Sequence, residues 1–357
     1  MSDIYKRKSL IVLKLLIVNS HCSLLLANYP RPFSLCRFAG EVNFFVATDF
    51  DVWYSVCRRK AKGDFMISTI FKSVVEFFLS IALCLNPLLG CGMGVEVQPY
   101  NAANESEVRI VQFNLRGFGV GKKSIAYRSL GMTALLNEIH PDSMGFQEAT
   151  YAWMLCLQNY LTDYAYVGVG RDDGGIMGEF SPIFYLKDKY TLLDSGTFWL
   201  SETPDEPGSK SWGSACTRIC TWALLANKET GKIYAHLNTH LDHVSDSART
   251  HQMELVLQKA KEYIGDYPVV LTGDMNDDSN SNMYAAATSI LVDTRLASPE
   301  TDNTATFHNY GLSVTNRIID YVFVSSDVTP VKYDVIDEKP NGDYVSDHNG
   351  ICVDLKF

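Results

Sequence analysis

Hydrophobic residues in this chain form short runs that end in polar side chains, and residues 267–276 show the pattern most clearly. The apolar run Tyr267-Pro-Val-Val-Leu271 is followed by Thr-Gly-Asp-Met-Asn276. A β-branched and aliphatic run that breaks at Gly273 predicts a buried strand ending in a tight turn. Because residues two apart on an extended chain point to the same side, Asp274 and Asn276 should leave the strand end together.

The same kind of pattern predicts further elements between residues 107 and 357. Strands are predicted at 108–113, 143–146, 164–169, 182–185, 218–226, 232–238, 317–324 and 350–355. Helices are predicted at 124–140, 151–161 and 245–264, the last with Ser245 as its N-cap and Gly265 as its stop. Strands and helices do not alternate strictly, and Val322-Phe-Val324 is apolar on both faces, as in strands covered on each side. We therefore expect two packed sheets covered by helices.

The first 106 residues lack the pattern of strands and helices that is predicted for residues 107–357. Residues 9–27 are apolar but interrupted by polar residues, which predicts a weak membrane span or a secretory core, and residues 28–62 have no clear periodicity. Residues 1–65 are interpreted as an extension that is not translated if Met66 is the true start. Residues 66–91 combine a short basic start, an apolar middle and the ending Leu-Leu-Gly-Cys91, which resembles the lipobox of bacterial lipoproteins. A single anchoring helix is the alternative. Both readings predict that the rest of the chain lies outside the cytoplasm, anchored to the envelope or secreted, with 92–106 as a polar tether.

Charge divides the chain near the same place. Residues 1–97 hold 11 Lys and Arg against 7 Asp and Glu, whereas residues 98–357 hold 20 against 34, a balance of −14. This balance argues against a protein that grips long nucleic acid, because affinity for the phosphate backbone comes mainly from Lys and Arg. It does not exclude a small or cation-bridged phosphate substrate. The four cysteines after residue 97 have no zinc-site spacing, and we expect them to be free thiols.

Candidate chemistry is concentrated at the predicted strand ends. The polar groups there are Asn114, Gln147-Glu148, Asn238-Thr-His240, Asp274-x-Asn276 and Ser346-Asp347-His348. Taken singly, each has an ordinary explanation, such as a solvated loop acid for Glu148 or a core histidine for His240. Asp320 lies inside an apolar strand, where a carboxylate without a partner is costly. His348 is the candidate partner.

In this order, the strand-end groups and Arg317-x-Ile-Asp320-Tyr resemble the motifs of the endonuclease/exonuclease/phosphatase superfamily. The resemblance covers about residues 107–357. It implies a four-layer α/β/β/α sandwich, in which two mixed sheets are flanked by helices as in pancreatic-type deoxyribonucleases. It also implies hydrolysis of phosphate esters that depends on Mg²⁺, with Mn²⁺ as a substitute.

The resemblance assigns the metal ligands as well. Glu148 is similar to the main ligand, with Asn114 nearby and Asp347 as a further ligand. One departure is Arg116, which stands where abasic-site endonucleases have an acidic residue. It argues against a second metal position and against a role in DNA repair.

Catalytic roles follow from the same resemblance. Asp274 is similar to the acid that orients or deprotonates the attacking water, and Asn276 to the amide that holds the phosphate. His348 resembles the catalytic histidine that Asp320 orients, and His240 the second histidine that contacts phosphate. These residue types suit the reaction, because an anionic ester needs its charge neutralised, a proton acceptor and a donor to the developing charge.

Loop residues carry the weaker hypotheses. Arg249, and with less weight Arg171 and Arg218, are predicted to bind substrate, and structural ion pairs are the alternative for the last two. The predicted function is an extracytoplasmic phosphodiesterase or nuclease-like enzyme, acting as a monomer on a nucleotide, a short nucleic acid, or a lipid or sugar phosphate. The alternatives are a sphingomyelinase-like phospholipid hydrolase at the membrane and a binding protein that keeps the fold without turnover.

Overall fold

The computed structural model describes residues 95–103, 106–313 and 317–357. The predicted extension at 1–65 and the predicted export or anchoring segment at 66–91, including Cys91, lie outside these residues. Within the described part of the chain, no helix is both long and apolar enough to cross a membrane.

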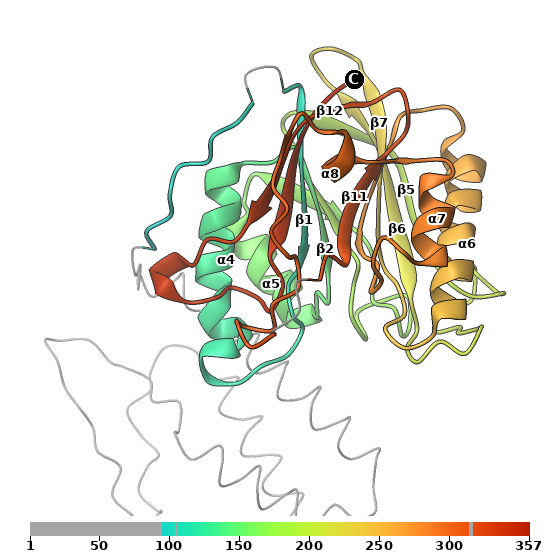
Figure 1. Cartoon of the computed structure of the whole chain (residues 1–357), viewed down its shortest axis with the longest axis horizontal. Helices are drawn as coiled ribbons and strands as arrows, with labels where there is room; N and C mark the ends of the chain where they lie inside the picture. Colours follow the sequence, from blue (N-terminus) through green and yellow to red (C-terminus); the bar gives the residue numbers. More distant parts are fainter. Residues whose placement is uncertain (1–94, 104–105, 314–316) are drawn as a thin grey trace, which may run out of the picture. The chain divides into compact units, whose positions relative to one another are not determined.

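The first sheet has seven strands in the order β10-β12-β13-β1-β2-β4-β3. Their bounds are β1 (Val108–Asn114), β2 (Ser143–Gln147), β3 (Tyr164–Val167), β4 (Ile183–Leu186), β10 (Glu300–Thr301), β12 (Thr329–Ile336) and β13 (Gly350–Lys356). β1 pairs parallel with β2 and antiparallel with β13, so the sheet is mixed. Helices α4 (Ile125–Ile139) and α5 (Tyr151–Tyr160) cover its outer face (Figure 1).

The second sheet has six strands in the order β5-β6-β7-β8-β11-β9. Their bounds are β5 (Tyr190–Trp199), β6 (Ile219–Asn227), β7 (Ile233–His240), β8 (Val269–Asp274), β9 (Val292–Asp293) and β11 (Asp320–Val324). Helices α6 (Asp246–Ile264) and α7 (Asn282–Thr288) cover its outer face, and the short α8 (Thr294–Ala297) and two 3₁₀ turns, η2 (Gly121–Lys123) and η3 (Pro340–Gly342), lie in connections. The predicted four-layer α/β/β/α sandwich is confirmed.

Local sequence explains where the main helices begin and end. Ser245 caps α6, its hydroxyl accepting a hydrogen bond from the Ala248 N–H at 3.1 Å, and Gly265 ends the helix at φ 68°. Ser124 caps α4 in the same way. Both caps satisfy backbone donors that a helix start leaves unpaired.

Among the longer elements, β5, β12 and α7 were not predicted, and neither were the short β9, β10, α8, η2 and η3. β5 is an edge strand with several exposed or half-buried side chains, so it lacks the apolar run that marks buried strands. The strand predicted at 317–324 begins only at Asp320.

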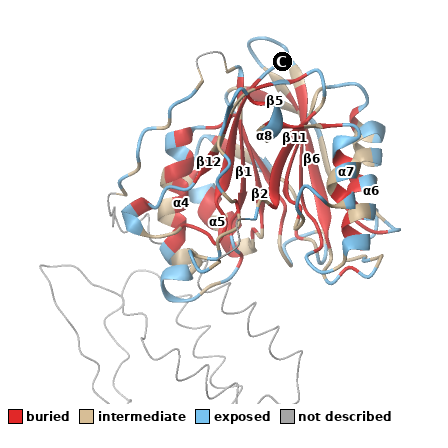
Figure 2. Ribbon diagram, in the orientation of Figure 1, coloured by how far each residue is buried: buried red, intermediate tan, exposed pale blue. Residues whose placement is uncertain are grey.

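Alternate residues of the central strands face two different environments. On β8 and β11, Val270 and Val322 belong to the core that includes the first sheet, whereas Leu271 and Phe323 pack toward α6 and α7. The strands are accordingly buried and the outer helix faces exposed (Figure 2). Between the sheets lies a buried polar network of Gln112, Ser143, Gln147, His236, Asn238 and Thr272, which we call the inter-sheet network.

Gly145 of β2 lies close against the second sheet. A Cβ atom at this position would lie 2.2 Å from Thr272 Oγ1 and 2.7 Å from Asn238 Cγ. The absence of a side chain on β2 therefore lets the inter-sheet network form across a short gap.

The described part of the predicted tether contacts the domain. Residues 95–103 have no regular secondary structure, but the Ala103 N–H donates to Asp354 at 2.8 Å. The Tyr100 ring lies under the guanidinium of Arg109, 4.7 Å from its centroid. The segment is thus held along β13 and β1. The four cysteines described by the structure are free, and all are buried except the half-buried Cys216.

Candidate active site

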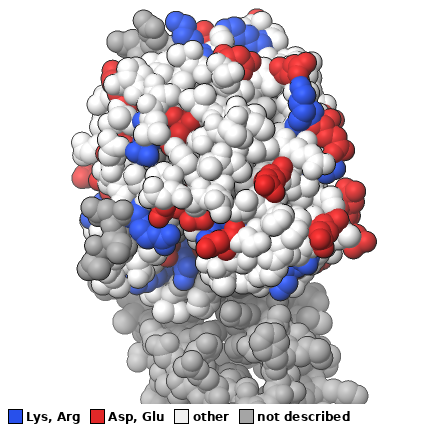
Figure 3. Space-filling model, turned by 45° about the vertical axis from the view of Figure 1, so that its right-hand side comes forward, with Lys and Arg blue, Asp and Glu red and all other residues white. Residues whose placement is uncertain are grey.

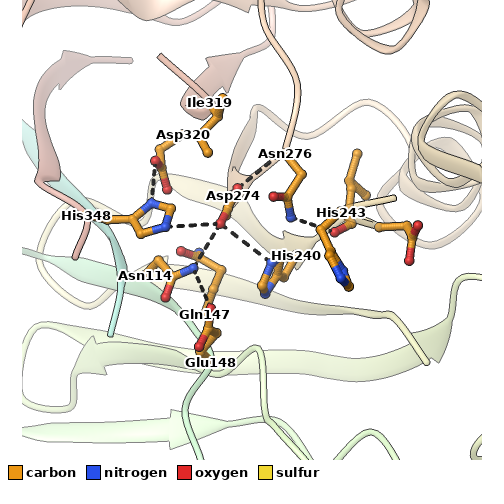
Figure 4. Close-up of polar contacts among 12 residues, drawn as sticks. Asn114, Gln147, Glu148, His240, His243, Asp274, Asn276, Ile319, Asp320 and His348 are labelled. Carbon is orange, nitrogen blue, oxygen red and sulfur yellow. Dashed lines mark hydrogen bonds and ion pairs between the residues drawn. The ribbon is translucent and has the colours of Figure 1, made fainter. Parts of the chain in front are cut away.

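Strand pairing brings the predicted strand-end residues together. Asp274 ends β8, opposite Asp320 of antiparallel β11 and beside His240 of parallel β7. In the other sheet, Asn114 at the end of β1 is paired with Gln147 at the end of β2. Figure 4 shows these side chains converging on Asp274 from both sheets. The site therefore lies at one end of the gap between the sheets.

Asp274 is the centre of the cluster and is almost completely buried. One carboxylate oxygen accepts hydrogen bonds from Asn114 Nδ2 at 2.9 Å, and the other from the Asn276 N–H at 2.9 Å. His240 Nε2 and His348 Nε2 lie 3.5 and 3.8 Å from Asp274 Oδ2. Burial and the neighbouring Asp320 raise the pKa of Asp274 to about 7, although His348 opposes the shift. A carboxylate with such a pKa can accept a proton near neutral pH.

His348 and Asp320 form the predicted pair. His348 Nδ1 lies 2.9 Å from Asp320 Oδ2, and Gln112 Nε2 donates to the other oxygen of Asp320 at 2.9 Å. Burial favours the neutral imidazole, but the attraction of Asp320 and Asp274 outweighs it and raises the pKa of His348 to about 10. The ring of Phe307 packs edge-on against the imidazole at 4.9 Å. His348 is therefore a fixed imidazolium with Nε2 turned toward Asp274.

Glu148 lies on the other side of Asn114, and its side chain is 15% exposed. Its oxygens accept from the Gly117 N–H at 2.9 Å and from Asn114 Nδ2 at 3.3 Å. Burial alone would raise its pKa, but the Gly117 N–H and Arg116 outweigh burial, so the pKa of Glu148 is lowered. Glu148 is thus an anionic and partly accessible carboxylate.

Arg116 lies across the predicted metal ligands. Its guanidinium is 3.7 Å from Glu148 and 3.5 Å from Asp347, and its side chain is 46% exposed. Asn114 turns its amide nitrogen toward Glu148 and Asp274, while its oxygen accepts from the Arg116 N–H. In this state Asn114 bridges two carboxylates and does not present an oxygen ligand.

These donors fit a hard divalent cation. Glu148 and Asp347 supply carboxylate oxygens at a partly open edge, where water can complete the coordination that Mg²⁺ prefers. Asp274, Asp320 and His348 also offer atoms within 4.8 Å of one another. That group is an internal hydrogen-bonded set, because His348 Nδ1 is already bonded to Asp320. Glu148 is therefore the better metal ligand.

The remaining predicted residues differ in how they are placed. Asn276 is half-buried in a left-handed turn at φ 54°, and its amide donates to the Leu241 carbonyl at 3.0 Å. His240 is buried, and its Nδ1 has no hydrogen-bond partner among the described residues. Burial first, and then nearby Arg218, lower its pKa well below the usual value, so the ring is neutral.

The structure argues against substrate contact by Arg249. Its Nε donates to Asp277 at 2.7 Å, its Nη1 to the Asp242 carbonyl at 3.0 Å, and its Nη2 to Asp246. The side chain is only 7% exposed. Every guanidinium nitrogen is therefore used in holding the start of α6 to neighbouring loops.

Arg171 and Arg218 border a recess next to the catalytic cluster. The recess is too narrow for a water molecule as the side chains stand, and its lining includes Glu148, Glu179 and His240. Arg171 Nη1 donates to Glu179 at 2.5 Å, so the ion-pair alternative holds for Arg171. Arg218 has only His243 Nδ1, at 3.2 Å, as a hydrogen-bond partner among the described residues.

Sequence reasoning missed Gln112 and Arg128. Gln112 orients Asp320, and a polar residue inside the apolar run 108–113 was the available signal. Arg128 on α4 donates to the carbonyls of Leu115, Arg116 and Val345 at 2.6–2.7 Å. It therefore ties the loop after β1 to the segment that carries His348, and helical position alone gives no sign of this role.

Comparison with known proteins places the chain in a family. The profile described as Endonuclease/Exonuclease/phosphatase family matches residues 111–348. The chain belongs to this family. Members of the endonuclease/exonuclease/phosphatase family are phosphoesterases, and this chain is a metal-dependent phosphoric ester hydrolase of that kind. The comparison with curated proteins found no match.

Solved structures of the family include close relatives of this endonuclease/exonuclease/phosphatase protein. A Bacteroides vulgatus endonuclease/exonuclease/phosphatase is 36% identical, with a TM-score of 0.68 over 70% of this chain and 98% of that chain. The Bacteroides thetaiotaomicron mannosyl-6-phosphatase is 32% identical, with a TM-score of 0.67 over 70% and 100%. D. rerio TDP2, complexed with a single-stranded DNA product, shares 20% identity and a TM-score of 0.58 over 70% and 99%, which shows the fold alone.

Proposed function

We propose that this protein uses Mg²⁺ to hydrolyse a small phosphate ester. The observation that carries the proposal is the convergence on Asp274 of Asn114, His240 and the His348–Asp320 pair, with Glu148 one hydrogen bond away. Glu148, with Asp347 beside it, would hold the cation, and Mn²⁺ should substitute. A bound divalent cation would neutralise phosphate charge and polarise a phosphoryl oxygen.

The protonation states of the side chains suggest which role each one has in the reaction. Asp274, with a pKa raised to about 7, can accept the proton of the attacking water. The His348 imidazolium directs Nε2 at the same place and can stabilise negative charge on phosphate or protonate the leaving oxygen. Asn276 and neutral His240 supply uncharged polar contacts.

Arg116 supports a site with a single metal ion. Its guanidinium lies 3.7 Å from Glu148 and 3.5 Å from Asp347, so it already neutralises part of the carboxylate charge that a second cation would need. A positive side chain there performs part of the charge neutralisation that a second ion would provide.

A sugar phosphate is the substrate we place first. The sequence favoured a phosphodiester, but the mannosyl-6-phosphatase relative supports a phosphomonoester of a sugar. On the face shown in Figure 3, Lys and Arg form small separate groups among acidic and uncharged residues, with no continuous basic stripe. A polyanionic strand would need such a stripe. These observations favour a small substrate over long nucleic acid.

A substrate panel tests this function with the full-length protein. Mannose 6-phosphate, a synthetic phosphodiester, short DNA and RNA, and sphingomyelin are incubated with Mg²⁺, Mn²⁺ or a chelator. We expect hydrolysis of the sugar phosphate that the chelator abolishes and that Glu148→Ala and His348→Ala reduce at least 100-fold. Glu138→Ala on the exposed face of α4 and His140→Asn at its end are matched controls. Undiminished turnover in Glu148→Ala or His348→Ala would refute the assigned roles, and inactivity on every ester would favour a binding protein.

We also propose that the protein acts outside the cytoplasm, held by a lipid on Cys91 or by an anchoring helix. The support is the sequence of residues 66–91 alone. Globomycin-sensitive processing that Cys91→Ala abolishes would identify the lipoprotein form. Recovery of the full-length protein in the cytoplasmic fraction would contradict both forms.

A further inference from the structure

The recess beside the catalytic cluster contains a cation, Arg218, that makes no close ion pair within the described chain, although Glu179 attracts it. Arg218 is 4% exposed, and its Nε and Nη1 have no hydrogen-bond partner within the described chain. Its only hydrogen-bond partner there is the ring nitrogen His243 Nδ1, at 3.2 Å. A buried guanidinium costs several kcal/mol unless an anion or several acceptors compensate it. Arg218 therefore lacks the partner that would explain its burial.

One further donor borders the same recess. Arg171 Nε is buried and makes no hydrogen bond within the described chain, although it lies 3.9 Å from Asp172 Oδ1. With Arg218 it forms a set of buried guanidinium nitrogens beside one recess that, as the side chains stand, is too narrow for a water molecule. Such a set suits an anionic oxygen group, which accepts several hydrogen bonds at once.

Glu179 occupies part of this space in the ligand-free chain. Its carboxylate pairs with Arg171 and lines the recess, and burial raises its pKa. The recess is narrow as the side chains stand, so an entering anion would have to displace Glu179 from Arg171. A glutamate held in a place where its charged form is disfavoured is well suited to such an exchange.

We propose that this recess is a second anion site, which binds an anionic oxygen group of the substrate other than the phosphate that is hydrolysed. Glu148 and His240 belong to both the recess and the catalytic cluster, so one small molecule can reach both. The substrate class is then a phosphate ester with a second phosphate, sulfate or carboxylate. The inference rests on the proposed function only in naming the ligand as substrate.

Binding of two sugar phosphates tests the proposal without turnover. In a full-length His348→Gln background with Mg²⁺, calorimetry compares fructose 1,6-bisphosphate with fructose 6-phosphate. We expect the bisphosphate to bind at least ten-fold more tightly. Arg218→Met should reduce that ratio below three-fold, and Glu179→Gln should increase it, because the competing charge is removed.

Stability provides the control for folding. Since Arg218 makes no close ion pair that would compensate its burial, Arg218→Met should not lower the melting temperature of the protein without ligand. If Arg218→Met fails to fold, two other variants still test the preference for the bisphosphate. Glu179→Gln should increase the affinity ratio, and Arg171→Met should decrease it. Equal affinities for the two sugars, or a ratio that none of the three changes moves, would overturn the second anion site. Selective bisphosphate binding by a protein that hydrolyses no ester would leave the site standing and refute the proposed function.

Discussion

Replacing Arg128 by methionine should cost both stability and activity. Arg128 is 2% exposed and lies over the ring of Trp153 at 5.1 Å. Its guanidinium donates to four carbonyls, those of Leu115, Arg116, Lys123 and Val345. Methionine fills similar space but offers no donor, so the change removes the hydrogen bonds while largely keeping the packing.

The size of the effect follows from the carbonyls left behind. Two of the hydrogen bonds, to Leu115 and Val345, are buried. An unsatisfied buried acceptor costs about 1–3 kcal/mol, and removal of the buried charge recovers part of that loss. We expect a loss of about 3 kcal/mol in the free energy of unfolding. For a domain of this size, that corresponds to a fall of roughly 6–12 °C in the melting temperature.

Catalysis should fall as well, because the two loops that Arg128 joins carry Asn114 on one side and His348 on the other. We expect kcat to drop about ten-fold, with a smaller change in KM, since distances within the cluster change more than access to it. Urea denaturation and steady-state kinetics measure the two effects. Arg128→Lys is the control and should lie between wild type and Arg128→Met. An Arg128→Met protein within 0.5 kcal/mol of wild type and with wild-type kcat would refute this reasoning.

Three other perturbations test the fold. Burial lowers the pKa of His236 to about 3, so the imidazole stays neutral in the folded protein, whereas in the unfolded chain it takes up a proton below about pH 6.5. The free energy of unfolding should therefore fall as the pH decreases from 6.5, by about 2 kcal/mol at pH 5. Urea denaturation at pH 7.5 and at pH 5 should show that His236→Gln loses less stability between the two pH values than the wild type does. An equal loss in the two proteins would contradict this role of His236. Gly145→Ala places a methyl group against Thr272 and should cost about 3 kcal/mol in thermal unfolding, with partial recovery on adding Thr272→Ala; additive losses would argue against the clash. Ser245→Ala removes the cap of α6 and should cost about 1 kcal/mol in urea denaturation, and no loss would show that water replaces the hydroxyl.

The catalytic cluster could be predicted from sequence because its residues share one local signature. Asn114, Glu148, His240 and Asp274 each follow an apolar run, and strand ends on one edge of packed sheets must meet. Asp320 was identified by the opposite signal, a charge inside an apolar strand. Both signals depend on neighbours in the chain and need no knowledge of distant contacts.

The arginines show which contacts the neighbouring sequence does not reveal. Arg249 was the favoured substrate residue, but each of its three guanidinium nitrogens donates to Asp246, Asp277 or the Asp242 carbonyl, and only the folded chain shows that these groups surround it. Arg128 was missed because its partners are main-chain carbonyls, one of them 217 residues away. β5 was missed because an edge strand exposes polar side chains along one side. In each of these cases the interaction cannot be inferred from the residues next to it in the sequence.

The hydrogen bond from Gln112 to Asp320 joins the inter-sheet network to the imidazole of His348. From Gln112 the connections continue through Gln147 and Asn238 to Thr272, far from any solvent. The side-chain amides between the sheets and the His348 imidazole thus belong to one continuous set of hydrogen bonds. Substituting one of these amide side chains would change the orientation of the next. Substitutions that change substrate preference should accordingly occur around the recess and its loops. The amide residues of the inter-sheet network should tolerate almost no substitution.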